Sequence, residues 1–271
     1  MGARAEFGET AEGQGGQSAV RSIERACRVL KCFSLYENRL NLSAIAGSVG
    51  LSPSTALRIL STLVSAGVLK RNRDRSYSLG DEFYIMGAMA KAHFTPPQIA
   101  YPQMKELRDE TLEAVSLFGV EGEERVCYEH LPSPRMMRSV IHVGDRLPLW
   151  AGAAGKALLA YAGDDVIERE AAKISRVTGA TPLDRETLIR ELAEVRRRDY
   201  AISRGELEEG VMAIAVPIFD TTGQTGGEGK PTFATYCISL SAPSTRVDDD
   251  LSTRLVYRMQ EISAKISRQM S

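Results

Sequence analysis

The chain has 271 residues, of which 43% are hydrophobic, so it is long enough for two globular domains with sizeable cores. It contains no run of eighteen apolar residues and no apolar segment near its start, which excludes a membrane span and a signal peptide and leads us to expect a cytoplasmic protein. The formal net charge is −1, but residues 18–80 hold ten Lys and Arg against three Asp and Glu, whereas residues 81–271 hold 23 against 29. This asymmetry indicates a basic nucleic-acid module joined to an acidic module that is not meant to touch DNA.

The first predicted segments are a tail and a helix. Residues 1–17 combine many glycines with three glutamates, which predicts a disordered tail. An amphipathic helix is predicted over Val20–Leu35, because Ile23, Ala26 and Leu30 share one side of it. We expect this helix to pack on the elements that follow.

Residues 42–67 show the pattern of two short helices joined by a tight turn. In the first helix the apolar residues recur at helical spacing, and Gly50 follows it directly, where a left-handed residue lets the chain turn. The second helix begins with Ser52 as its N-cap and Pro53 at its first position, and it ends at Gly67. Its buried stripe is predicted to consist of Leu57, Leu60, Leu63 and Val64.

The side chains left outside this second helix are of the kind that reads DNA. Ser54, Thr55 and Arg58 are short hydrogen-bonding groups and one long cation near its N-terminus. A two-stranded basic hairpin is predicted over Leu69–Gly80, and a hairpin of this kind grips the phosphate backbone. Together these elements predict a winged helix-turn-helix that binds double-stranded DNA, as a dimer on a palindromic operator. The predicted DNA-binding residues are Ser52, Pro53, Ser54, Thr55, Arg58, Lys70, Arg71, Arg73 and Arg75.

A linker and a second domain complete the chain. A second apolar helix is predicted over Asp81–Phe94, and Thr95, Pro96 and Pro97 end it, so we place a linker helix over residues 81–97 and a domain boundary there. Residues 98–271 form the second domain, for which antiparallel strands interrupted by helices predict an α+β fold. Helices are predicted over residues 98–113, 153–161, 165–173, 185–198 and 247–269, and strands over 114–120, 125–131, 138–143, 211–219 and 233–241, with a Gly-rich loop at 221–230.

No catalytic or metal site is evident from residue types and spacing. The three histidines, His93, His130 and His142, have no partner at metal-ligand spacing. The stretch Gly152–Ala157 mimics a phosphate loop, but it lacks the first glycine and the Ser or Thr that such a loop needs. Its small residues suit either tight packing or the floor of a ligand site, and the residue types alone leave both open. The same alternatives hold for three small residues that alternate on one predicted strand, Cys237, Ser239 and Ser241.

Four stretches, taken in order, resemble the isocitrate lyase regulator (IclR) family of bacterial transcription factors. They lie in the family's order, the resemblance extends over nearly all of residues 18–271, and four such motifs in sequence are highly specific. The resemblance implies a helix-turn-helix head and a GAF-like effector domain that binds a small, often aromatic, organic acid from a catabolic pathway. It also implies homodimers through the heads and often homotetramers through the effector domains. The four stretches are Leu51–Gly67, Gly144–Ala160, Arg204–Ile218 and Ile238–Pro243.

The resemblance also implies where the effector binds. It favours the interpretation that the small residues line a ligand pocket over the interpretation that they only allow tight packing. In the family, the residues that contact the ligand lie in the small-residue loop, in the next strand and the segment just before it, and in the final strand. Trp150 and Gly152 replace the His and Thr common in that loop, which predicts a more aromatic wall. The implied effector-binding residues are Gly152, Ala153, Ala154, Ser203, Glu206, Val211, Ala213, Cys237, Ser239 and Ser241.

Two other classes of function are weighed against this one. An enzyme acting on a small acid, tethered by the DNA-binding head, is disfavoured by the lack of an acid-base constellation. A thiol-based redox regulator would use Cys127 or Cys237. The cysteines Cys27, Cys32, Cys127 and Cys237 are scattered, which favours buried thiols in a reducing compartment over zinc or disulfides, and no cofactor or metal is expected.

Overall fold

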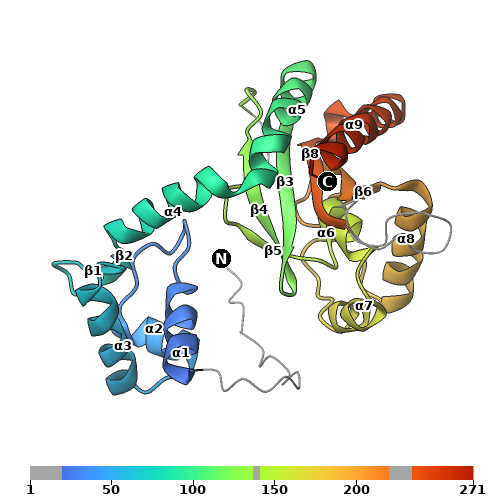
Figure 1. Ribbon diagram of the computed structural model, residues 1–271. Coiled ribbons are helices and arrows are strands. Elements are labelled where there is room, and N and C mark those ends of the chain that lie inside the picture. The colour runs from blue at the N-terminus through green and yellow to red at the C-terminus, as the bar shows by residue number, and fades with distance from the viewer. Residues whose placement is uncertain (1–19, 137–140, 220–233, 271) are drawn as a thin grey trace. The chain divides into compact units, whose positions relative to one another are not determined.

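The computed structural model describes residues 20–136, 141–219 and 234–270. The predicted tail, the loop at 221–230 and the first part of the predicted strand 138–143 lie outside these residues. The described chain divides into two compact units, one ending at His93 and one beginning at Phe94, and each is treated by itself. Figure 1 labels their helices and strands.

The first unit is a helix-turn-helix with a wing. Its core brings side chains from every element before the linker together, among them Val29, Ile45, Leu60 and Tyr77. The wing sheet is a hairpin, and Leu40 adds an isolated antiparallel bridge to Tyr77. The elements are α1 (Arg21–Leu30), α2 (Leu42–Val49), α3 (Pro53–Ser65), β1 (Leu69–Arg71), β2 (Tyr77–Leu79) and α4 (Asp81–His93).

The turns of this unit follow the predicted chemistry. The Asn41 side chain caps α2 by accepting a hydrogen bond from the Ala44 amide, and Gly50 ends α2 with a left-handed φ of 65°. Gly67 has a φ of 73°, and a Cβ at Gly80 would collide with the Gly67 backbone. Both glycines are therefore required where the wing returns to the end of α3.

Two details of the first unit differ from the prediction. Helix α1 ends at Leu30 instead of Leu35, because a turn follows directly. Leu57, predicted to be buried, is 43% exposed, while Ala56 takes the inward position one residue earlier. Helix α4 has no buried residue within the described chain. Its largely exposed apolar side chains are Tyr84, Ile85, Met86 and Met89.

The second unit is built on one six-stranded antiparallel sheet, with the strand order β5-β4-β3-β8-β7-β6. A tight turn at Gly122 and Glu123 joins β3 to β4 in a hairpin. The helices are α5 (Thr95–Thr111), α6 (Gly152–Leu159), α7 (Asp164–Ala171), α8 (Arg185–Arg198) and α9 (Asp249–Met270). The strands are β3 (Ala114–Glu121), β4 (Glu124–Leu131), β5 (Arg146–Pro148), β6 (Ala201–Arg204), β7 (Val211–Phe219) and β8 (Ala234–Pro243).

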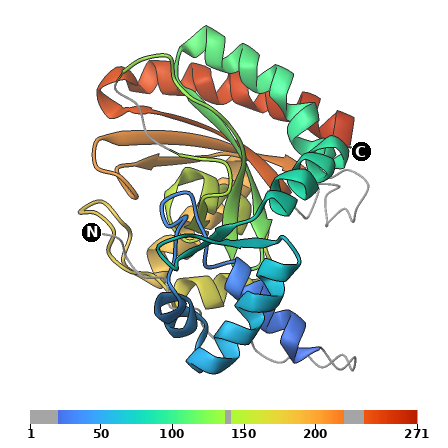
Figure 2. The ribbon, with the colours of Figure 1, turned by 90° about the vertical axis from the view of Figure 1, so that its left-hand side faces the viewer.

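Helices cover both faces of this sheet. Figure 2 shows α5 and α9 side by side along one face, where Met104 of α5 and Met259 of α9 belong to one apolar cluster with the strands. A second cluster on the other face joins the sheet to α6, α7 and α8 through Leu158, Ile167 and Leu192. Burial on both faces explains why the central strand β3 is almost continuously buried.

The predicted fold class is confirmed in its main statement: the protein is α+β, with an N-terminal winged helix-turn-helix and a C-terminal α/β domain. The likeness of the second domain to GAF domains stays a prediction. The strand predicted over 138–143 was wrong in its described part, since residues 141–143 are not extended and the edge strand is Arg146–Pro148. Strand β6 was not predicted. Helix α5 begins at Thr95 because prolines fit the first turn, where no amide donor is needed.

Candidate functional site

The N-terminus of α3 presents the predicted base-reading face. The Ser52 hydroxyl accepts a hydrogen bond from the Thr55 amide at 3.3 Å, and Pro53 occupies the first turn. Pro53, Ser54 and Arg58 are exposed. Thr55 is half-buried, and its hydroxyl lies 2.9 Å from that of Ser52, so it serves the cap as well as the surface.

The wing presents three unpaired cations. Arg71, Arg73 and Arg75 are exposed, and none of them forms an ion pair with another residue of the described chain. Lys70 differs, because its ammonium lies 2.5 Å from the carboxylate of Asp81 at the start of α4. A phosphate at Lys70 would therefore have to compete with Asp81, whereas the three arginines are available.

The tip of the wing is held by its own hydrogen bonds. The Asp74 carboxylate accepts from the amide and hydroxyl of Ser76, and these bonds hold the pKa of that carboxyl below its usual range. The Asn72 amide donates to the Ser76 carbonyl at 2.8 Å, which closes the turn. Asp74 is thus engaged within the turn and does not form an ion pair with the neighbouring arginines.

The second unit contains a cavity of about 170 Å³ under the sheet, beside the first turn of α6. The structure brings nine of the ten predicted effector residues to its wall, from α6, from β6 and the loop after it, and from β7 and β8. The lining consists of Phe118, Arg125, Ile141, Leu147, Gly152, Ala153, Ala154, Ser203, Glu206, Leu207, Glu208, Val211, Ala213, Ser239 and Ser241.

Cys237 is the tenth predicted residue, and it does not reach the cavity wall. It is fully buried on β8, with its sulfur 3.6 Å from the carbonyl oxygen of Ala154. Burial raises the pKa of the Cys237 thiol to about 12. The residue therefore packs behind α6 as a protonated thiol, while Ser239 and Ser241 on the same strand line the cavity.

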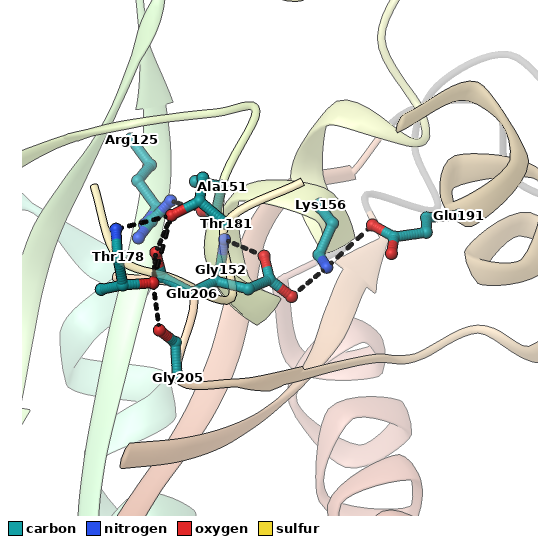
Figure 3. A network of polar contacts seen from close by, with 9 residues as sticks. All are labelled: Arg125, Ala151, Gly152, Lys156, Thr178, Thr181, Glu191, Gly205 and Glu206. Carbon is teal, nitrogen blue, oxygen red and sulfur yellow. Dashed lines mark hydrogen bonds and ion pairs between the residues drawn. The ribbon is translucent and has the colours of Figure 1, made fainter. Parts of the chain in front are cut away.

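Glu206 is buried and its polar atoms already have partners (Figure 3). One carboxylate oxygen lies 2.5 Å from the Lys156 ammonium, and the other accepts from the Gly152 amide at 2.9 Å. The Glu206 carbonyl oxygen accepts from the hydroxyls of Thr178 and Thr181 at 3.2 and 2.8 Å. Glu206 thus ties the loop after β6 to the first turn of α6, and it holds the small residues of that turn in place.

Six lining residues were not predicted. Phe118 and Arg125 come from β3 and β4, and the Arg125 guanidinium carbon lies 5.5 Å from the centre of the Phe118 ring. The sequence signal that was available is the placement of Arg125 and Cys127 two residues apart, on one face of a strand. Ile141, Leu207 and Glu208 lie in loops, and Leu147 lies on the three-residue strand β5, where residue periodicity gives no signal.

The described residues offer neither a metal site nor a membrane-spanning helix. No group of three or more His, Cys, Asp or Glu side chains there is placed to hold a metal ion. No helix there is long and apolar enough to cross a membrane.

Two family models match the chain. Residues 22–73 match the IclR helix-turn-helix domain, and residues 96–268 match the C-terminal domain of the bacterial transcriptional regulator IclR. The regulator KipR of Bacillus subtilis is 27% identical over 256 residues, which are 94% of this chain and 98% of KipR. The regulator KdgR of Escherichia coli is 30% identical over 251 residues, 89% of this chain and 92% of KdgR. The crystal structure of an IclR homolog from Microbacterium hydrocarbonoxydans, complexed with 4-hydroxybenzoate, has a TM-score of 0.74 at 28% identity and covers 92% of this chain and 98% of its own.

Proposed function

This chain belongs to the IclR family of bacterial transcriptional regulators, and we propose that a small organic acid bound in the cavity of its second unit sets its affinity for an operator of a catabolic operon. Its relatives are named as transcriptional regulators, so the chain is a regulator and not an enzyme. The observation that carries the effector proposal is the cavity, whose wall is assembled from segments far apart in the sequence.

The size and surroundings of the cavity support a ligand of about one aromatic ring. Its volume of about 170 Å³ is close to the ~150 Å³ of an engineered apolar cavity that accepts benzene. The first turn of α6 contributes Gly152, Ala153 and Ala154 to the wall, and a helix N-terminus favours negative charge. The homolog from Microbacterium hydrocarbonoxydans was crystallised with 4-hydroxybenzoate, an acid of this size.

For the DNA side we propose a palindromic operator bound by a homodimer, with a homotetramer formed through the effector domains. Ser54 and Arg58 at the exposed start of α3 would read base edges, and Arg73 on the wing would contact phosphates. Residues 18–80 are the DNA-binding domain, residues 81–97 the linker and residues 98–271 the effector domain, and the protein acts in the cytoplasm.

The effector acts by differential binding. A ligand shifts DNA affinity only if it binds one conformation of the protein better than another, and the coupling free energy in such systems is about 1–3 kcal/mol. We propose that the two conformations differ in the spacing of the two heads of a dimer, set by the linker that contains α4.

The thiol-based alternative has less support. Burial raises the pKa of Cys127 and of Cys237 to about 12, so both thiols are protonated at neutral pH and are poor nucleophiles. Cys27, which is exposed, lies on α1 of the first unit and is not among the residues that line the cavity.

The test is DNA binding by the purified protein to the intergenic region upstream of its own gene, at fixed salt, titrated with small organic acids that include 4-hydroxybenzoate. We expect specific binding whose affinity one acid changes about 5- to 150-fold. Specific binding that no acid changes would contradict the effector part of the proposal. Absence of specific binding there and at other promoters would contradict the operator part.

A further inference from the structure

Arg125 is a buried cation on the cavity wall. Its side chain comes from β4, and the residue is only 2% exposed. One terminal nitrogen, Nη1, donates to the carbonyl oxygens of Pro148 and Ala151, the latter at 2.7 Å. Within the described chain Arg125 has no ion pair, and its Nε has no hydrogen-bond partner. Since buried charges in proteins are normally paired, this arrangement leaves part of the guanidinium unsatisfied.

The charge of Arg125 persists despite its burial. Burial lowers the pKa of this guanidinium to about 10, which still leaves it protonated at neutral pH. Backbone carbonyls satisfy hydrogen-bond donors, but they carry no net charge to balance the cation. The cavity therefore has one cation on its wall, and the side chain that carries it is buried.

The nearest acid on the wall, Glu206, is already engaged. Its carboxylate is paired with Lys156 at 2.5 Å, and Lys156 also lies 3.0 Å from Glu191 (Figure 3). Its other oxygen accepts from the Gly152 amide. Lys156 is shared between Glu206 and Glu191, and neither carboxylate forms an ion pair with Arg125, which is the only cation among the described residues that line the cavity. Glu208, the second acid on the lining, is exposed to solvent at the rim.

Two glycines let the guanidinium lie against α6. A Cβ at Gly155 would collide with Nη1 and would lie 2.5 Å from the Leu149 carbonyl oxygen. A Cβ at Gly152 would lie 3.4 Å from Nη2, so this nitrogen is beside a residue that lines the cavity. Because Nη1 is used by the carbonyls and Nε is fully buried, Nη2 is the nitrogen that remains to donate a charge-assisted hydrogen bond to a carboxylate.

We propose that Arg125 is the residue that selects the effector by charge, because its Nη2 binds the single carboxylate of a monoanionic ligand. This inference rests on the proposed function of the cavity as an effector site. It narrows the ligand class from small organic acids to monocarboxylates. A dicarboxylate places a second negative charge where no cation on the described wall remains to balance it, and a neutral isostere leaves Arg125 unpaired.

The first test uses the unaltered protein and isosteric ligand pairs. Acetate, pyruvate, benzoate and 4-hydroxybenzoate are each compared with the corresponding primary amide, and benzoate is compared with terephthalate, by isothermal titration calorimetry. We expect at least one monocarboxylate to bind on the order of 10- to 100-fold more tightly than its amide, the range for a hydrogen-bonded charged group. Equal affinities of every acid and its amide, or no binding by any acid, would overturn the inference.

The second test asks whether the preference depends on Arg125. Arg125→Gln is expected to reduce the acid-to-amide affinity ratio to about one, whereas Arg125→Lys retains part of it because the charge remains. Arg146→Gln is the matched control, since Arg146 on the neighbouring strand pairs with Glu124 at 3.2 Å and does not line the cavity. An Arg125→Gln variant that keeps the full ratio would overturn the inference.

The two tests separate the inference from the proposed function. If amides bind as tightly as acids and also change DNA affinity, the proposed ligand-responsive regulator is supported and the proposed role of Arg125 is contradicted. If Arg125 variants fail to fold, the acid-to-amide ratio of the unaltered protein still decides the inference. A protein that binds monocarboxylates through Arg125 but shows no specific DNA binding would instead contradict the proposed function.

Discussion

The buried pair of Lys156 and Glu206 allows a quantitative prediction about the second unit. The side chains are 4% and 7% exposed, and the atoms that pair them are 2.5 Å apart. Lys156 has a second acid, Glu191, at 3.0 Å, whereas the Glu206 carboxylate has only the Gly152 amide besides Lys156. The two single substitutions are therefore expected to have unequal costs.

Lys156→Met is expected to lower the free energy of unfolding by about 3–5 kcal/mol, because it leaves the Glu206 carboxylate buried without an ion-pair partner. Glu206→Gln is expected to cost less, about 1–3 kcal/mol, because Lys156 keeps Glu191 and the amide oxygen still accepts a hydrogen bond. The double variant is expected to be more stable than Lys156→Met alone, because the uncompensated charge is gone.

Trp150 provides the assay. It is the only tryptophan of the chain, it is 6% exposed, and it lies two residues before Gly152, so its fluorescence reports unfolding of the second unit. For a unit of this size, 3–5 kcal/mol corresponds to a fall in Tm of about 6–20 °C. The control is Arg185→Met, which removes an exposed pair with Glu168 and is expected to cost less than about 1 kcal/mol. A Lys156→Met cost no larger than that of the control, or a double variant no more stable than the single one, would refute the reasoning.

Four further predictions concern the two sites. Arg58→Ala should cost about 1–3 kcal/mol on the cognate operator and much less on unrelated DNA, as measured by competition binding; equal losses on both would exclude a base contact. Arg73→Ala should weaken binding to all sequences and lower the slope of log K against log salt by about one, so an unchanged slope would exclude its phosphate contact. Gly155→Ala should destabilise the second unit by about 1–3 kcal/mol in urea unfolding, because its methyl group meets the Leu149 carbonyl oxygen, and a neutral effect would contradict the close packing. At neutral pH a maleimide should label exposed Cys27 and spare Cys237, whose pKa is raised to about 12 by burial; mass spectrometry showing rapid labelling of Cys237 would reopen the thiol mechanism.

The local elements of the head could be predicted because their signals lie within a few residues of each other. The Ser52 cap, Pro53 in the first turn and the left-handed Gly50 each determine a helix boundary by local hydrogen bonding or steric freedom. Leu57 was misplaced because helical spacing alone allows either of two adjacent positions to face inward. Packing against α2 and β1 decides between them, and that contact is not visible in the sequence.

The short strands of the second unit lacked such local signals. Strand β6 spans only Ala201–Arg204 at the edge of the sheet, and its pairing with β7 defines it more than its composition does. Strand β5, at Arg146–Pro148, is shorter still and ends in a proline. Edge strands of this length depend on partners distant in the chain, so periodicity does not reveal them.

Arg125 was not identified from the sequence as a cavity residue, and the reason lies in how the sheet is covered. Directly after a hairpin turn, a charged residue on a strand is normally taken as solvent-facing, because one face of an antiparallel sheet is usually wet. Here helices cover both faces, so the alternation along β4 directs Arg125 into the interior, on the same face as Cys127 and with its guanidinium over the Phe118 ring. A charge placed there costs free energy unless something balances it. The fold supplies two carbonyl oxygens but no carboxylate in an ion pair with Arg125 among the described residues, so a bound anion is the partner that would complete the site.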